Sequence, residues 1–194
     1  MDRMDTPDLE VRARIEDYAL LSNCRTAALV SRAGSIDWLC LPRLDSASTF
    51  AAVLGDESHG RWLLRPTDPA AVSTRRYDED TFVLVTRWES AGAVAEVHDF
   101  VPIGLDPDTA IRRTDLIRRV VGVQGSMRFE QRLSIRFDYA RVMPWVRQVG
   151  SEGEPCLLAM GGPDAVTLRG ASLTAIDHQH RGDRVSPAAV DVTA

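Results

Sequence analysis

The sequence contains no lysine: all 23 of its basic residues are arginine, against 28 acidic residues and a net charge of −5. A nucleic-acid-binding protein usually presents a basic face, so this balance argues against a nucleic-acid partner. The arginine fork suits carboxylates and phosphates, but uniform use of one basic residue is more simply explained by genome composition.

Cysteine is also scarce, and the three residues Cys24, Cys40 and Cys156 are odd in number and widely spaced. This pattern gives neither a disulfide framework nor a metal clip, and it is typical of reduced thiols in a cytoplasmic protein. No apolar run approaches the ~18 residues of a membrane helix, and the first ten residues are too acidic for a signal peptide. We therefore expect no membrane partner.

The clearest element that is present covers residues 126–137. Apolar side chains alternate with polar ones throughout this segment, with Gln131 as the one interruption on the apolar side. Such a period of two predicts a long strand with one face buried, because a helix would scatter the same residues around its surface.

Shorter runs of the same texture predict further strands at residues 26–31, 35–41, 81–89, 93–100, 115–123, 156–160 and 165–168. Turn residues at 32–34, 90–92 and 122–125 predict hairpin connections between them. One short helix is expected at residues 49–54, with Ser48 as its cap and Gly55 at its end. Many strands and almost no helix predict an all-β fold, an antiparallel β-sandwich.

Three segments are expected along the chain: a flexible lead-in at 1–14, the sandwich at 15–181 and a frayed or truncated tail at 182–194. The lead-in is charged and lacks a strand period, and the tail contains Pro187 and several small residues.

An ordered series of short motifs carries a family resemblance. They lie at residues 15–20, 24–30, 34–46, 54–57, 60–62, 74–77, 99–102, 136–139 and 144–146. Together they resemble the N-terminal domain of bacterial glycoside hydrolase family fifteen proteins of the trehalase-like and glucoamylase-like branch, whose sandwich is of the supersandwich type. Two positions depart from the family pattern: Ala140 stands where glycine is usual, and Leu44 where phenylalanine is common.

The resemblance implies an inverting glycosidase acting on trehalose or α-glucosides, with a catalytic α/α barrel following this domain. That mechanism needs one carboxylic acid and one carboxylate ~6.5–9.5 Å apart. No stretch of the chain matches the barrel's motif, so we assign no catalytic residue and expect the chain alone to be inactive. The barrel is the expected partner.

Four residues are candidates for the rim of a sugar site: Asp37, Trp38, Arg43 and Asp45. An aromatic face, an arginine fork and carboxylates can together stack on a sugar ring and bind its hydroxyls. The alternative is structural: Trp38 packs in the sandwich, Arg43 pairs with Asp45, and Asp37 caps a turn.

Two further aromatic residues, Tyr139 and Trp145, are candidates for contact with the barrel, although large aromatics are more often core residues. His98 and Asp99 point to opposite faces of a strand, and the other histidines are distant, so no metal site is expected. No cofactor-binding loop is present in the sequence.

Three functions remain open. The first is an accessory domain that docks on the barrel and completes its active-site rim. The second is a free-standing carbohydrate-binding module, which predicts sugar binding by residues 15–170 alone. The third is an autonomous enzyme, which predicts a pocket with two carboxylates at the inverting separation.

Overall fold

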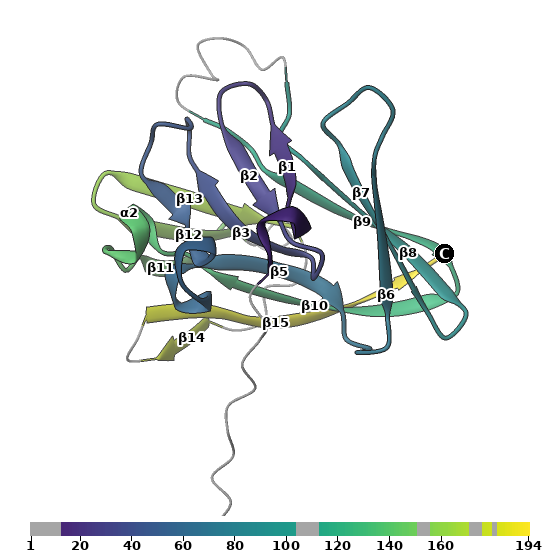
Figure 1. Cartoon of the computed structure of the whole chain (residues 1–194). Coiled ribbons are helices and arrows are strands. Elements are labelled where there is room, and N and C mark those ends of the chain that lie inside the picture. The colour runs from purple at the N-terminus through teal and green to yellow at the C-terminus, as the bar shows by residue number, and fades with distance from the viewer. Residues whose placement is uncertain (1–12, 104–112, 151–155, 171–175, 180–181) are drawn as a thin grey trace, which may run out of the picture.

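The computed structural model describes residues 13–103, 113–150, 156–170, 176–179 and 182–194 (Figure 1). Most of the expected lead-in, residues 1–12, lies outside these ranges. No helix in the described part of the chain is long and apolar enough to cross a membrane.

Eight strands form the largest sheet, which runs through the middle of the molecule (Figure 1). Its order is β1-β2-β3-β5-β10-β15-β14, with β4 paired to β3, and every pairing is antiparallel. The strands are β1 (Ala19–Ser22), β2 (Ala27–Val30), β3 (Ser35–Cys40), β4 (Ser48–Phe50), β5 (Arg61–Pro66), β10 (Ser126–Ser134), β14 (Ile176–Gln179) and β15 (Gly182–Thr193).

Two smaller antiparallel sheets complete the strand set. The four-stranded sheet contains β6 (Val72–Tyr77), β7 (Leu84–Ser90), β8 (Ala93–Phe100) and β9 (Ile117–Gln124) in chain order. The three-stranded sheet contains β11 (Trp145–Val149), β12 (Cys156–Gly161) and β13 (Asp164–Arg169). The remaining elements are short: η1 (Ile15–Asp17), η2 (Ala52–Leu54), η3 (Glu57–His59) and α2 (Phe137–Ala140).

The main core lies where all three sheets meet. Ile36 and Leu133 from the large sheet, Leu84 from the four-stranded sheet and Leu157 from the three-stranded sheet belong to one buried cluster. A second cluster, which includes Trp88 and Phe129, lies between the large and four-stranded sheets. The predicted all-β, antiparallel architecture is confirmed, and its layers pack face to face as in a sandwich.

The long predicted strand is confirmed over most of its length, because β10 buries Met127, Phe129, Gln131 and Leu133 and turns the residues between them away from the core. It ends at Ser134 rather than at Phe137, which begins α2. Ser134, Ile135 and Arg136 are all buried, so the alternation of buried and exposed residues ends at Leu133.

One short helix is present, as predicted, but it is α2, and the predicted position at residues 49–54 is wrong. Ser48 does not cap a helix but begins β4, and Thr49 and Phe50 are buried in the pairing with β3. Only Ala52–Leu54 form a single 3-10 turn. Burial of a β-branched and an aromatic residue outweighs the capping signal, because both residue types fit a sheet surface.

The tail also differs from the expectation of a frayed segment. Residues from Gly182 to Thr193 form β15, which pairs with β10 along most of its length. Pro187 lies where the register between the two strands shifts, between the pairs that join β10 to Ala188 and Val185. A proline is tolerated at such an irregularity because it has no N–H to donate to the ladder.

Candidate functional site

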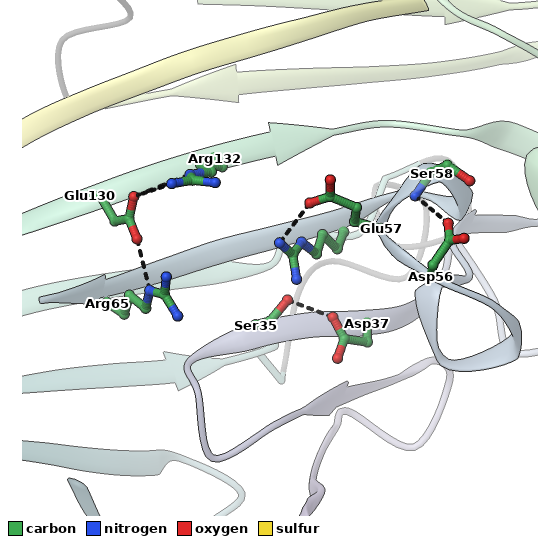
Figure 2. A network of polar contacts seen from close by, with 9 residues as sticks. Ser35, Asp37, Asp56, Glu57, Ser58, Arg65, Glu130 and Arg132 are labelled. Carbon is green, nitrogen blue, oxygen red and sulfur yellow. Dashed lines mark hydrogen bonds and ion pairs between the residues drawn. The ribbon is translucent and has the colours of Figure 1, made fainter. Parts of the chain in front are cut away.

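Asp37 lies on the face of the large sheet that is turned away from the core. It has no partner in the register between β2 and β3, where Leu29 pairs with Trp38 and Val30 with Ile36. Its carboxylate, 8% exposed, accepts hydrogen bonds from Ser35 Oγ and, at 2.7 Å, from the Tyr18 hydroxyl (Figure 2 shows the Ser35 contact). Asp37 therefore binds two hydroxyl groups and does not cap a turn.

The Tyr18 hydroxyl is correspondingly hard to ionise. Burial raises the pKa of Tyr18, and the hydrogen bond to Asp37 and the charge of Asp37 raise it further, against a smaller lowering by Arg61. A phenol with a raised pKa remains a neutral donor at physiological pH. The pair is thus a fixed hydrogen bond that holds the start of β1 against β3.

Trp38, the next residue, lies outside both core clusters and is half-buried. Its ring faces Tyr139 from α2, with ring centroids 6.1 Å apart and planes at 42°. Tyr139 is 43% exposed. The structure therefore joins a residue expected at the sugar rim to one expected at the interdomain contact.

The backbone around Tyr139 is unusual. Asp138, Tyr139 and Ala140 have φ values of 49°, 56° and 66°, all in the left-handed region. Each such residue costs about 1–2 kcal/mol when it is not glycine. The turn is closed by reciprocal backbone hydrogen bonds of 3.0 and 3.1 Å between Phe137 and Val142, and Tyr139 N–H donates to Ser48 Oγ at 2.9 Å.

Arg43 and Asp45 lie on the loop between β3 and β4. Arg43 donates through Nε at 2.7 Å and through Nη2 at 2.9 Å to the two carboxylate oxygens of Asp45. The hydrogen bond from Arg43 holds the pKa of Asp45 below its usual range. Both side chains are exposed, so the pair contributes little to stability and remains accessible from solvent.

Register places this loop and the aromatic pair at the same end of β3. Cys40, the last residue of β3, pairs with Ser48, and Ser48 in turn holds Tyr139. The loop tip is fixed where Leu44 N–H donates to the Arg25 carbonyl oxygen at 2.8 Å. Of the four expected rim residues, Trp38 contacts Tyr139, and Arg43 and Asp45 lie on the loop that follows the same end of β3. Asp37 is instead buried against Tyr18 and Ser35.

A network of arginines and glutamates covers the neighbouring strands of the same face (Figure 2). Glu130 on β10 accepts from Arg65 on β5 at 2.7 Å and from Arg132 at 2.9 Å, and Arg61 donates to Glu57 at 2.8 Å. Burial, the largest influence, raises the pKa of Glu130, but the bond from Arg65 and the charge of Arg132 outweigh it and lower that pKa. Each of these arginines is thus paired with a glutamate on the same face.

Trp145 lies apart from this arrangement, on the outward side of β11. It is 57% exposed, and the guanidinium carbon of Arg147 lies 5.2 Å from the centroid of its ring. Its backbone neighbour in β12 is Met160. One side of the indole therefore already carries a cation–π contact.

Four carboxylates among the described residues lack the raised pKa that the general acid of a glycosidase needs. A general acid needs a raised pKa, whereas the pKa values of Asp45, Asp56, Asp68 and Glu130 are all lowered by hydrogen bonds. No cluster of three metal-binding side chains occurs within the described ranges. What the arrangement offers is a preformed surface of aromatic rings and hydrogen-bonding groups.

Ser48 and Tyr18 are the two supporting residues that sequence reasoning missed. Ser48 is fully buried and was interpreted as a helix cap, a role that serine often fills. Tyr18 belongs to the first motif of the family resemblance, but nothing in its spacing points to Asp37, which is 19 residues away.

The chain is similar in sequence to a known protein family and to several trehalases. A family described as "Trehalase-like, N-terminal" matches residues 10–193. The trehalase of Mycolicibacterium smegmatis is 36% identical over 170 residues, covering 80% of this chain and 25% of the relative. That of Mycobacterium tuberculosis is 35% identical with the same coverage, and that of Thermoplasma volcanium is 35% identical over 91 residues.

No solved structure matches the chain. The chain spans about a quarter of the length of the first two trehalases. Because the family match runs over nearly all of the sequence, this chain belongs to the trehalase-like N-terminal family.

Proposed function

We propose that the chain is the accessory N-terminal domain of a longer glycoside hydrolase that acts on trehalose or a related α-glucoside. The observation that carries this proposal is the coverage: four-fifths of the chain matches only a quarter of each mycobacterial trehalase. The catalytic domain then lies in the part of those enzymes that the chain does not match. By the family resemblance, this domain is an α/α barrel.

In this proposal the chain docks on the catalytic domain and completes the rim of its active site. Exposed apolar side chains support the docking role, because they gain most from burial against another surface. Those near the end of β3 and in the α2–β11 segment are Leu44 (59% exposed), Tyr139 (43%), Met143 (51%) and Trp145 (57%). The residues that would then face the sugar are Trp38, Arg43 and Asp45. Asp37 would not contact sugar but would hold β3 in place through its hydrogen bonds with Tyr18 and Ser35.

A chimera tests the proposal. Residues 10–193 replace the matching quarter of the M. smegmatis trehalase, and trehalose hydrolysis is measured with and without Arg43→Ala. We expect the chimera to hydrolyse trehalose and the variant to raise KM about three- to tenfold, since one charge-assisted contact to a hydroxyl is lost. The isolated chain should release no glucose.

The matched control is Arg76→Ala, which removes an exposed arginine paired with an aspartate two residues later, Asp78, but on the four-stranded sheet. It should leave the kinetics of the chimera unchanged. Equal kinetics for Arg43→Ala and the unmodified chimera would contradict the rim role.

A free-standing carbohydrate-binding module is the second candidate, favoured by the partly exposed Trp38–Tyr139 pair. It predicts that sugar binds to the isolated chain as tightly as to the chimera. It also predicts that Arg43→Ala has no effect on the KM of the chimera. The same experiment therefore separates the two functions.

A further inference from the structure

We infer that Trp38 and Tyr139 together form a stacking site for one glucopyranosyl ring, and that Ser48 is the residue that positions Tyr139 for it. This inference rests on the proposed function and names the element of the rim that contacts sugar. It also moves Tyr139 from the interdomain contact, where the sequence suggested it, to the sugar-binding surface.

The first argument is the strained backbone. Three successive left-handed residues without a glycine persist only where the surroundings fix them, and such strain gathers at functional sites. Here the fixing contacts are the Phe137–Val142 hydrogen bonds and the bond from Tyr139 N–H to buried Ser48 Oγ. The side chain that this turn presents is Tyr139.

The second argument is the position of the rings. The two rings are 6.1 Å apart and tilted by 42°, so they contact each other without stacking face to face. Neither ring belongs to a core cluster, and Tyr139 is 43% exposed. Trp62 and Trp88, in contrast, pack against or within the core clusters, and Trp145 already carries Arg147.

The third argument is the chemistry of the loop that follows β3. A pyranose offers apolar C–H faces ringed by hydroxyl groups, so it needs an aromatic surface with donors and acceptors close by. The exposed Arg43–Asp45 pair supplies both kinds of group from the loop at the same end of β3.

The test uses the isolated chain and the indole N–H signals of its four tryptophans in nitrogen-15 NMR spectra. Trehalose is titrated into the millimolar range, with sorbitol as an acyclic polyol that has no ring face to stack. We expect the Trp38 indole signal to move with trehalose in a saturable manner, and the Trp145 signal to stay in place. Sorbitol should move neither.

Variants identify the second ring and its support. Tyr139→Ala should weaken binding about two- to tenfold because one stacking surface is lost, whereas Tyr139→Phe should bind like the unmodified chain. Ser48→Ala should weaken binding while leaving the dispersed spectrum of a folded protein. Trp145→Ala is the control for loss of an exposed aromatic and should bind normally.

A Trp38 signal that trehalose does not move overturns the inference, and so does full binding by Tyr139→Ala. The pair would then be an apolar contact for the catalytic domain. These outcomes leave the proposed function intact if Arg43→Ala still raises the KM of the chimera. Conversely, sugar binding at Trp38 together with unchanged chimera kinetics supports the inference and rejects the accessory role.

Discussion

At the scale of single residues, the turn at Tyr139 explains a departure from the family pattern. The sequence has Ala140 where relatives of this type usually carry glycine, and Ala140 has a φ of 66°. Glycine reaches this region without the steric penalty of a Cβ atom. The usual glycine therefore relieves strain that this chain retains.

Ala140→Gly should accordingly stabilise the protein. Relief of the left-handed alanine is worth about 1–2 kcal/mol, and the greater freedom of glycine in the unfolded chain removes roughly 0.5–1 kcal/mol of that gain. The net increase in the free energy of unfolding is at most about 1.5 kcal/mol and centres on about 0.75 kcal/mol, measurable by urea denaturation.

The neighbouring residue provides the control. Arg141 has right-handed dihedral angles, φ −78° and ψ −27°, so Arg141→Gly brings no relief and should cost roughly 0.5–1 kcal/mol. Destabilisation by both glycine substitutions would show that residue 140 is not strained.

At the scale of secondary-structure elements, the strand pattern was predictable where one face of a strand is apolar. The prediction of β8 has the observed bounds, and the Ser90-Ala91-Gly92 hairpin is confirmed, with Ala91 and Gly92 both at positive φ as a two-residue turn requires. Periodicity succeeds in these strands because burial alone decides which way each side chain points.

β6 escaped prediction for the opposite reason. Its inward side carries Ser73 and Arg75 rather than apolar residues. Arg75 is half-buried, and its Nη1 donates to the Val30 carbonyl oxygen at 3.1 Å, which replaces apolar contact with a hydrogen bond to β2. A pattern of hydropathy contains no signal for such a contact.

The residues of the candidate site also differ in how far the sequence alone could predict their contacts. The Arg43–Asp45 pair was predictable because its partners are two residues apart. The pairing of Trp38 with Tyr139 was not, since it depends on how α2 packs against β4, where the bonded residues Tyr139 and Ser48 are 91 positions apart in sequence. Packing of Trp38 in the core, the structural alternative, is not what the structure shows.

The free edge of β1 leads to a prediction of its own. Both backbone groups of Leu20 bind the hydroxyl of Tyr77 at the end of β6, at 3.0 Å for the N–H and 2.9 Å for the carbonyl oxygen. One hydroxyl thus occupies hydrogen-bonding groups that an edge strand would otherwise offer to another chain, and it ties the large sheet to the four-stranded sheet.

Tyr77→Phe should cost about 0.5–1.5 kcal/mol and speed amide hydrogen exchange at Leu20, because the ring remains while both hydrogen bonds are lost. Tyr139→Phe, which removes a hydroxyl from another partly exposed tyrosine, should leave Leu20 exchange unchanged. Protection of Leu20 that is equal in all three proteins would argue against the edge role of Tyr77.

At the scale of the whole molecule, one buried arginine joins the two larger sheets. Arg118 on β9 pairs with Asp99 on β8 at 2.8 Å, and both side chains are only 1% exposed. Its other nitrogens donate to the carbonyl oxygens of Trp62, at 2.7 Å, and Gly34, at 2.8 Å, in the large sheet. A buried charge is tolerated here because nearly all of its hydrogen-bonding capacity is used.

Removing the arginine alone should therefore be severe. Arg118→Met leaves Asp99 buried without its cation and should lower the free energy of unfolding by about 3–5 kcal/mol, measured by chemical denaturation. The double variant Arg118→Met/Asp99→Leu removes both charges and should lose less than the single variant, although Gly34 and Trp62 still lack their donor. The control is the exposed Arg76–Asp78 ion pair. Arg76→Ala should change the free energy of unfolding by at most about 1 kcal/mol. If the double variant is the less stable of the two, the penalty comes from lost packing between the sheets, and the ion pair is not what holds them together.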